Sequence, residues 1–385
     1  MRILHTSDWH IGRTFHGHST LDALRGVLDA LTDRVRALGV DVVIVAGDVF
    51  DSATPAAACY TLLSDSLRAI ADTGATVVVT SGNHDSAARL GFQAGLLRDG
   101  IHVLTDPDAV GTPLTLTDDH GPVHIYGIPY LEPALLRHRD DGWAGVRTQA
   151  EVLGHAMDRI RGDLAARGGR SVAIAHSFAA GVEPTPQLER DIQQGGLDIV
   201  PVSTFDGVDY MALGHIHGRQ RVSDHVRYAG APLHYSFGEG DKPRGAWIVD
   251  LDAAGLSAVE WVDLPIPRRL VTLRGAFADI LSDEAYAEHR EAWVCVEYTD
   301  DLPEPDPLRR LQERFPFCAR VAHTPAAARE EARTTYVERV RAARTDRELV
   351  EAFLVHVREG EGASDREDAL LEDVLEQRVR AEALA

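Results

Sequence analysis

Carboxylate, amide and imidazole side chains gather in five short motifs of this 385-residue chain. Each motif overlaps or follows a short run that predicts a strand, and these runs are Arg2–Ser7, Val42–Ala46, Thr76–Thr80, Ser171–Ala175 and Tyr210–Leu213. Because α/β sheets collect their ligand sites beyond the carboxyl ends of their strands, we expect the motifs to converge. They are Asp8-Trp9-His10, Gly47-Asp48-Val49-Phe50-Asp51, Gly82-Asn83-His84-Asp85, Ala175-His176-Ser177 and Gly214-His215-Ile216-His217.

The motifs contain seven side chains that suit a divalent metal ion, namely Asp8, His10, Asp48, Asn83, His176, His215 and His217. Seven ligands exceed what one four-coordinate zinc ion needs, and they suit two divalent ions roughly 3.5–4 Å apart that share a carboxylate. Oxygen and imidazole ligands without thiolate favour Mn²⁺, with Zn²⁺ and Fe²⁺ as open alternatives. The chemistry predicted for such a pair is hydrolysis of a phosphate ester.

Local spacing supports convergence of the donors. Asp8 with His10, and His215 with His217, are each one residue apart, so in an extended segment each pair would present two ligands to one point. A glycine directly precedes three of the donors and allows the backbone to approach closely there. Taken singly, each motif is also explained by a turn, a polar strand end or a hydrogen-bonded core histidine. Their shared position at strand ends is what favours a metal site.

Charge and composition limit the function classes. The net charge of −21 argues against a broadly basic nucleic-acid-binding surface. Two dications would bring four positive charges against two carboxylates, which leaves a local surplus that suits a phosphodiester. The three cysteines form no ligand pattern and predict free, buried thiols. No apolar run approaches the roughly 20 residues of a membrane span, and the N-terminus lacks signal-peptide features. We expect a cytoplasmic protein with no membrane association.

Strands alternate with amphipathic helical stretches through the first part of the chain, which predicts βαβ crossovers and a largely parallel sheet. The fold class expected is α/β, a two-sheet αββα sandwich over residues 1–265. A Pro-Ile-Pro segment marks the boundary to a small α/β capping module at 266–325. Residues 326–385 are predicted to form charged helices. Capping-box spacing at Thr345…Glu348 and Ser364…Glu367 precedes amphipathic runs, the second with Leu370, Leu371, Val374, Leu375 and Val379 on one face.

The series of motifs resembles that of the calcineurin-like metallophosphoesterase superfamily. Within it, residues 4–12, 45–51, 210–217 and 226–232 resemble bacterial DNA nuclease subunits. The resemblance covers residues 1–265 strongly, and the remainder agrees in layout more than in sequence. Archaeal and eukaryotic relatives place a histidine where this chain has Asp51, so the role of that histidine does not transfer.

The resemblance implies roles for individual side chains. One metal would be held by Asp8, His10, Asp48 and His217, and the other by Asp48, Asn83, His176 and His215, with Asp48 as the bridge. His84 is expected to stabilise the transition state or to protonate the leaving 3′ oxygen, oriented by Asp85 or Asp51. Asp51 is equally well explained as a turn acceptor. Arg13 and Arg89 are candidates for contacts with DNA phosphates, with solvated side chains as the alternative.

The same resemblance implies an activity and partners. The activity would be a Mn²⁺-dependent 3′→5′ exonuclease on duplex DNA, with ATP-regulated endonuclease cutting at hairpins and blocked ends. The partner would be an ABC-type ATPase with a long coiled coil, docked on the C-terminal helices, with a homodimer inside a heterotetramer. The setting implied is DNA repair, replication and recombination at the nucleoid. Two alternatives stay open: a phosphodiesterase for cyclic nucleotides or other small molecules, and a non-catalytic scaffold with a vestigial site.

Overall fold

The computed structural model describes residues 1–92, 94–139, 142–179, 199–325, 346–357, 362–364, 366–368, 370, 371 and 374. Contacts divide the chain into two compact units, Met1–Val271 and Thr272–Ala385. Among the described residues, none of the helices combines the length and apolar character that crossing a membrane requires.

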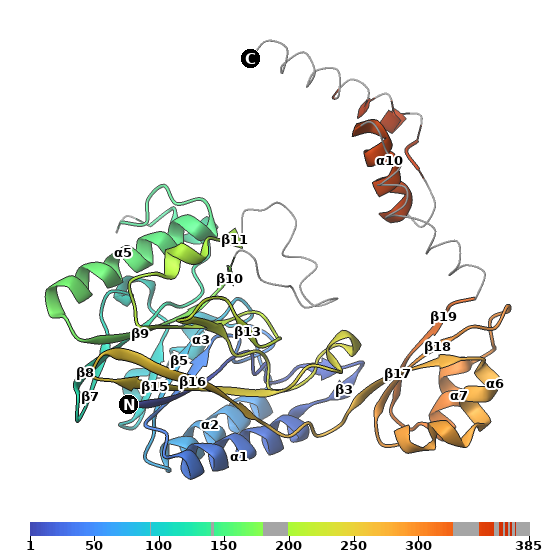
Figure 1. The fold of residues 1–385 in the computed structure, drawn as a ribbon, viewed down its shortest axis with the longest axis horizontal. Coiled ribbons are helices and arrows are strands. Elements are labelled where there is room, and N and C mark those ends of the chain that lie inside the picture. Colours follow the sequence, from blue (N-terminus) through green and yellow to red (C-terminus); the bar gives the residue numbers. More distant parts are fainter. Residues whose placement is uncertain are drawn as a thin grey trace. The chain divides into compact units, whose positions relative to one another are not determined.

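The first unit is built on two six-stranded sheets (Figure 1). The first sheet has the order β16-β15-β1-β4-β5-β6, in which β1, β4, β5 and β6 are parallel and β15 and β16 are antiparallel. Its strands are β1 (Arg2–Thr6), β4 (Val42–Ala46), β5 (Thr76–Thr80), β6 (Ile101–Leu104), β15 (Gly245–Asp252) and β16 (Gly255–Asp263).

The second sheet has the order β13-β14-β12-β9-β8-β7, with β14, β12, β9 and β8 parallel. Its strands are β7 (Leu114–Asp118), β8 (Gly121–Gly127), β9 (Arg170–His176), β12 (Tyr210–Gly214), β13 (Gln220–Arg221) and β14 (Val226–Tyr228). Two-residue pairs are formed by β2 (Thr14–Phe15) with β3 (His18–Ser19) and by β10 (Phe178–Ala179) with β11 (Ile199–Val200).

Helices cover the outer faces of the paired sheets. Figure 1 shows α1 (Leu21–Leu38) and α2 (Ala57–Ala71) on one side and α5 (Gln149–Arg167) on the other. Short elements join them: α3 (Ala87–Leu90), α4 (Pro133–Leu136), and the 3₁₀ turns Ala94–Leu96, Pro107–Ala109, Val202–Phe205 and Phe237–Glu239. Three buried apolar clusters fill the layers: α1 and α2 against the first sheet, α5 against the second, and sheet against sheet. The αββα sandwich predicted from the sequence is confirmed.

The amphipathic stretch at residues 86–98 does not form one continuous helix. The structure has only one turn, α3, followed by a separate 3₁₀ turn at Ala94–Leu96. Glycines at positions 91 and 95 interrupt the segment, and glycine is among the least favourable residues inside a helix.

The second unit contains a three-stranded sheet of order β17-β18-β19. Its elements in chain order are β17 (Leu270–Gly275), α6 (Phe277–Ser282), a 3₁₀ helix (Glu284–His289), β18 (Trp293–Tyr298), α7 (Pro307–Arg314) and β19 (Cys318–His323). The helical segment between β17 and β18 is broken at Asp283, which is extended and caps the 3₁₀ helix through its side chain. All three cysteines of the chain are free and buried, as predicted.

Beyond this sheet, the described residues contain the helix α10 (Asp346–Val357). The Glu367 carboxylate accepts hydrogen bonds from the backbone N–H and the hydroxyl of Ser364, in keeping with the predicted capping spacing. Residues 326–345, which include the predicted cap Thr345, lie outside the described residues. So do Leu375 and Val379 of the second predicted amphipathic run. The division at 265/266 and 325/326 therefore stays a prediction.

Candidate metal centre

Each candidate ligand follows or ends a parallel strand, as predicted. Asp8 and His10 follow β1, Asp48 follows β4, Asn83 and His84 follow β5, His176 ends β9, and His215 and His217 follow β12. The first three strands belong to one sheet and the last two to the other. The centre is therefore assembled where the carboxyl ends of both sheets meet.

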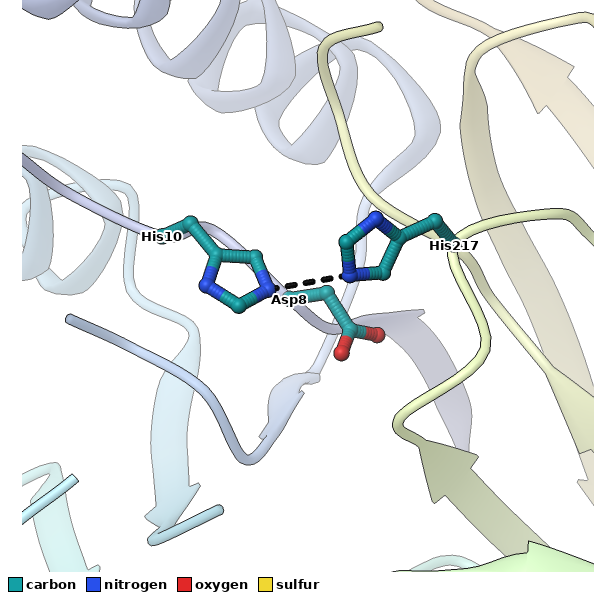
Figure 2. Close-up of side chains that lie close together, drawn as sticks. All are labelled: Asp8, His10 and His217. Atoms are coloured by element: carbon teal, nitrogen blue, oxygen red, sulfur yellow. Dashed lines mark hydrogen bonds between the residues drawn. The ribbon is translucent and has the colours of Figure 1, made fainter. Parts of the chain in front are cut away.

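One group of possible ligands consists of Asp8, His10 and His217, whose donor atoms all lie within 4.8 Å of one another. Figure 2 shows the two imidazoles turned toward each other, with Nε2 of His10 3.0 Å from Nε2 of His217. All three side chains are buried. If neither nitrogen carries a proton, their two lone pairs point at each other and repel. A positive charge nearby, such as a proton or a cation, relieves this repulsion.

A second group consists of Asp48, His176 and His215. Nε2 of His176 lies 3.2 Å from Oδ2 of Asp48 and 3.1 Å from Oδ1 of Asn83. Nδ1 of His215 lies 3.1 Å from the same Asn83 oxygen and 3.3 Å from Nε2 of His176. The structure therefore brings all four side chains assigned to one ion into contact.

Asp48 connects the two groups. Its Oδ2 lies 3.6 Å from Nε2 of His10 as well as 3.2 Å from Nε2 of His176. A third group of possible ligands combines His10, Asp48 and His84. His84 was assigned to catalysis on the sequence, and its imidazole lies within ligand distance of the same centre. Asn83 is exposed, so the centre opens to solvent on the side of the β5 loop.

The backbone at the donors differs from the extended geometry expected from the sequence. Positive φ angles occur at Asp8 (53°), His10 (44°), Asp48 (46°) and His215 (106°), four of the six non-glycine cases among the described residues. Such conformations cost on the order of 1–3 kcal/mol each and collect at functional sites. Asp8 and His10 still converge, but through left-handed turns. His215 and His217 belong to different groups, so an extended segment does not bring this pair to one point.

The glycines before the donors are needed for space. A Cβ at Gly47 would lie 2.3 Å from Nδ1 of His176, and one at Gly82 would lie 2.1 Å from Oδ1 of Asp48. A Cβ at Gly214 would lie 1.8 Å from the carbonyl oxygen of Ala46. These distances are far below contact, so the ligand loops pack without room for any side chain.

Hydrogen bonds donated to backbone carbonyls select the tautomers of two imidazoles. Nδ1 of His176 lies 3.1 Å from the carbonyl oxygen of Ala46, and Nδ1 of His84 lies 3.0 Å from that of Asp51. A carbonyl only accepts, so both Nδ1 atoms carry a proton. Nε2 of His176 is the atom that faces Asp48.

The protein's own charges leave the centre short of positive charge. Burial raises the pKa of Asp8 to about 7. Burial also opposes ionisation of Asp48, but nearby imidazoles, His176 first, outweigh it and hold the pKa of that carboxyl well below its usual value. Burial lowers the pKa of His176, yet attraction to Asp48 and Asp8 raises it to about 9. The negative charge of the two buried carboxylates therefore favours the protonated form of His176. A divalent cation bound at the same place would neutralise this negative charge instead.

Burial keeps the imidazoles of His10, His215 and His217 neutral. It lowers the pKa of His215 to about 3 and also lowers the pKa values of His10 and His217. A neutral imidazole keeps the lone pair that a metal ion binds. Buried carboxylates, neutral imidazoles and an amide oxygen around one opening fit divalent cations, and the arrangement could hold such ions against a phosphate ester.

Asp51 and Asp85 support the centre in ways that differ from the expectation. The Asp51 carboxylate lies 3.5 Å from Nδ1 of His10, and it is the Asp51 backbone carbonyl that contacts His84. The Asp85 carboxylate accepts hydrogen bonds from the backbone N–H groups of Val49, Phe50 and Gly82. Burial raises the pKa of Asp85 to about 6. Asp85 thus ties the loops after β4 and β5 together.

Arg13 lies beside the centre, and Arg89 lies on the one-turn helix α3. Arg13 donates to Oδ1 of Asp51 at 3.2 Å and stacks over the ring of Tyr235. Arg89 is exposed and donates to the carbonyl oxygen of Ala53 at 3.0 Å. Neither side chain is far from solvent, so both remain candidates for phosphate contact.

Two buried charged residues were missed by the sequence reasoning. Glu239 and Arg244 form an ion pair of 3.1 Å behind His217, and each is 2% exposed. The one available signal was the Ser-x-x-Glu spacing of Ser236 and Glu239, which does form a capping box. A capping box predicts a turn, but it does not predict that Glu239 lies beside His217, which is more than 20 residues away in the sequence.

The chain belongs to the calcineurin-like phosphoesterases, because the model of that family matches residues 1–219. A second model, that of the Type 5 capsule protein repressor C-terminal domain, matches residues 266–358. The chain is 31% identical over 330 residues to SbcD, the D component of nuclease SbcCD, from Escherichia coli strain K12, covering 81% of each chain, and equally to that of strain O157:H7. Within the phosphoesterases it is therefore a member of the SbcD family.

Solved structures add a distant likeness. The crystal structure of TT1561 from Thermus thermophilus overlays with a TM-score of 0.40 at 14% identity, covering 68% of this chain and 98% of that chain. At this level the likeness says nothing about chemistry. The family membership and the domain match, together with the clustered ligands, define a metal-dependent hydrolase of the nuclease class that binds divalent metal.

Proposed function

We propose that this chain is a two-metal nuclease that hydrolyses phosphodiester bonds of DNA. The observation that carries the proposal is the meeting of seven donor side chains, from both sheets, around one buried and solvent-connected centre. A single structural zinc would need only about four such ligands. Membership of the SbcD family supports DNA as the substrate.

The proposed ligand sets follow the two groups of side chains. The first ion would be held by Asp8, His10, Asp48 and His217, and the second by Asp48, Asn83, His176 and His215. Asp48 is the proposed bridge, supported by its 3.6 Å and 3.2 Å distances to imidazoles of the two groups. Mn²⁺ is the proposed metal because the ligands combine carboxylate, amide and imidazole without thiolate.

Divalent ions at such a site lower the pKa of water and neutralise charge that develops on a phosphoryl group. His84 is the proposed proton donor to the leaving 3′ oxygen. Its Nδ1–H is bound to the Asp51 carbonyl, so Nε2 is the atom that would carry and release the proton. Arg13 and Arg89 are proposed to contact DNA phosphates, and Asp51 and Asp85 to hold the surrounding loops.

The proposed partner is an SbcC-type ABC ATPase with a coiled coil. An apolar stripe on α10 supports this proposal, since Leu349, Phe353 and Val357 are spaced four residues apart and are 45%, 50% and 60% exposed. Amphipathic helices of this kind commonly bind in a partner's groove. The division into nuclease domain (1–265), capping domain (266–325) and ATPase-binding tail (326–385) is part of the same proposal. So are a homodimer within a heterotetramer and action at the nucleoid.

The test is digestion of end-labelled duplex DNA in Mn²⁺, with and without the ATPase and ATP, beside hydrolysis of cyclic nucleotides. We expect 3′→5′ shortening of linear duplex, and ATP-dependent internal cuts at hairpins and blocked ends when the ATPase is present. Cleavage of cyclic nucleotides with DNA left intact would replace the nuclease by a small-molecule phosphodiesterase. No metal-dependent hydrolysis of either would indicate a scaffold.

A further inference from the structure

Glu239 and His217 lie side by side, and each directs toward the other a side-chain atom that has no hydrogen-bond partner among the described residues. Oε1 of Glu239 lies 3.8 Å from Nδ1 of His217, and the side chains are 2% and 6% exposed. Among the described residues, neither of these two atoms has a hydrogen-bond partner. Leaving a buried donor or acceptor without a hydrogen bond costs about 1–3 kcal/mol. A functional role of the two side chains would explain why both atoms are buried at this separation.

Arg244 fixes the carboxylate and the histidine backbone together. Its guanidinium forms an ion pair of 3.1 Å with Oε2 of Glu239 and donates to the backbone carbonyls of His217 and, at 3.3 Å, Ala231. Oε2 of Glu239 also accepts hydrogen bonds from the backbone N–H groups of Tyr235 (2.7 Å) and Ser236 (3.1 Å). One carboxylate oxygen is thus fully engaged, while the other is aimed at the imidazole.

The same segment reaches the first ligand loop. The Tyr235 hydroxyl donates to the carbonyl oxygen of Trp9 at 2.8 Å, between the donors Asp8 and His10. The Tyr235 ring packs edge-on against the imidazoles of both His10 and His217. Residues 235–244 therefore contact each member of the first ligand group through a neighbour or directly.

We propose that Glu239 is a positioning residue that holds His217 for metal binding, with Arg244 holding Glu239 in place. This inference rests on the proposed function, since it takes His217 as a ligand of the first ion. With Nδ1–H of His217 directed at Oε1 of Glu239, the proton is fixed on Nδ1 and Nε2 is left free to bind the ion beside His10. A carboxylate behind a ligating imidazole fixes its tautomer and raises its basicity, and loss of such a partner typically costs 10–100-fold in metal affinity or activity.

The experiment is a Mn²⁺ titration of the full-length chain by calorimetry, for wild type, His217→Ala, Glu239→Gln and the double variant Glu239→Gln/Arg244→Gln. The single glutamine variant leaves Arg244 without a counter-ion in the interior, which could impair folding. The double variant removes both charges and keeps amide groups for the backbone hydrogen bonds. We expect 10–100-fold weaker binding at one of the sites in both glutamine variants, with the wild-type melting temperature recovered in the double variant.

Glu151→Gln is the matched control. Glu151 fills the same position in the capping box of α5, and its change makes the identical chemical replacement away from the centre. We expect wild-type Mn²⁺ affinity for this variant. Weakened binding here as well would mean that capping-box glutamates act on the centre through general stability, and the positioning role would be overturned.

A second measurement requires no variant of Glu239. The ¹⁵N shifts of His217 in the metal-free, histidine-labelled protein report which ring nitrogen carries the proton, with the signal assigned by His217→Gln. We expect protonated Nδ1 and free Nε2. The reverse tautomer, or wild-type Mn²⁺ affinity in the folded double variant, overturns the inference. Wild-type affinity in His217→Ala would instead remove His217 from the ligands and reject the ligand set under Proposed function.

Discussion

At the scale of single residues, His84 differs from the other imidazoles of the centre. It is only half-buried, whereas His10, His176, His215 and His217 are buried. Its backbone N–H donates to Oδ1 of Asp48 at 2.9 Å, so the loop is fixed by the Asp48 carboxylate while the ring stays accessible. This placement favours contact with substrate over permanent ligation.

We predict that His84→Ala lowers hydrolysis of DNA and of a small phosphodiester by about 10²–10⁴-fold, the usual contribution of a positioned acid or base. Mn²⁺ affinity should stay near wild type. The exposed His120, far along the chain on a turn, provides the control His120→Ala, which should retain full activity. A large loss of Mn²⁺ affinity in His84→Ala would make His84 a ligand, and unchanged hydrolysis would remove it from catalysis.

His5 is a second informative residue, buried between the two sheets. Its Nε2 lies 3.2 Å from the carbonyl oxygen of Leu213, so Nε2 carries the proton and Nδ1 accepts from the Tyr210 hydroxyl at 2.9 Å. Burial lowers the pKa of His5 to about 3 from an ordinary value of 6.5. In the unfolded chain, His5 therefore becomes protonated as the pH falls below 6.5. In the folded protein, His5 becomes protonated only near pH 3.

The stability contributed by neutral His5 is complete above pH 6.5 and falls as the pH drops toward 3, by up to about 1.4 kcal/mol per pH unit. We predict that wild type loses about 1 kcal/mol more unfolding free energy than His5→Gln between about pH 7.5 and 5.5. Urea unfolding of the two proteins at both pH values measures the difference, in which the other histidines cancel. Parallel pH profiles would contradict the assignment.

At the scale of elements, the carboxyl ends of parallel strands carry the donors, and glycines let the loops touch. Strands β1, β4 and β5 bring their loops together in one sheet, and β9 and β12 do so in the other. Gly82 follows β5 by two residues and packs against the carboxylate of Asp48 after β4. The loops therefore depend on each other's backbone position as well as on their side chains.

We predict that Gly82→Ala displaces Asp48 and weakens Mn²⁺ binding at least tenfold, because the new Cβ would lie 2.1 Å from Oδ1 and 2.3 Å from the backbone nitrogen of Asp48. Gly162→Ala is the matched control, since Gly162 lies within α5 with nothing within 4 Å of its Cβ position. There the same change should stabilise the helix by up to about 1 kcal/mol. Calorimetric Mn²⁺ titration tests the effect of Gly82→Ala, and thermal unfolding tests the effect of Gly162→Ala. Unimpaired metal binding in Gly82→Ala would show that the loops can move to make room for the new Cβ.

At the scale of the whole molecule, the chemistry and the proposed docking helix lie in different compact units. All the candidate ligands belong to Met1–Val271, and α10 belongs to Thr272–Ala385. Changes in the α10 stripe are therefore expected to alter assembly without altering the hydrolytic centre.

We predict that Leu349→Asp/Phe353→Asp abolishes co-purification with an SbcC-type ATPase while hydrolysis of a small phosphodiester remains at the wild-type rate. Both side chains are about half exposed, so the change should cost little folding stability. Leu302→Asp, at an apolar residue that is 77% exposed outside α10, is the control and should keep the partner. Retained assembly in the double variant would contradict α10 as the docking site.

The sequence alone determined the kinds of donor and the ends of the strands. Strand positions such as Val42–Ala46 and Thr76–Thr80 are encoded by runs made almost entirely of β-branched residues, a local property that a window of a few residues contains. Once the strands were known to be parallel, the rule that carboxyl ends share an edge predicted where the donors meet. The resemblance then divided them between two ions.

Only the tertiary structure decided which atoms face each other. His10 and His217 are 207 residues apart, and their contact depends on how two sheets pack, which no local pattern contains. The left-handed turns at the donors are likewise set by the tertiary structure and were not expected from the sequence. Glu239 was missed because its carboxylate comes near His217 only in the folded protein, where both side chains are buried and Oε1 of Glu239 lies 3.8 Å from Nδ1 of His217.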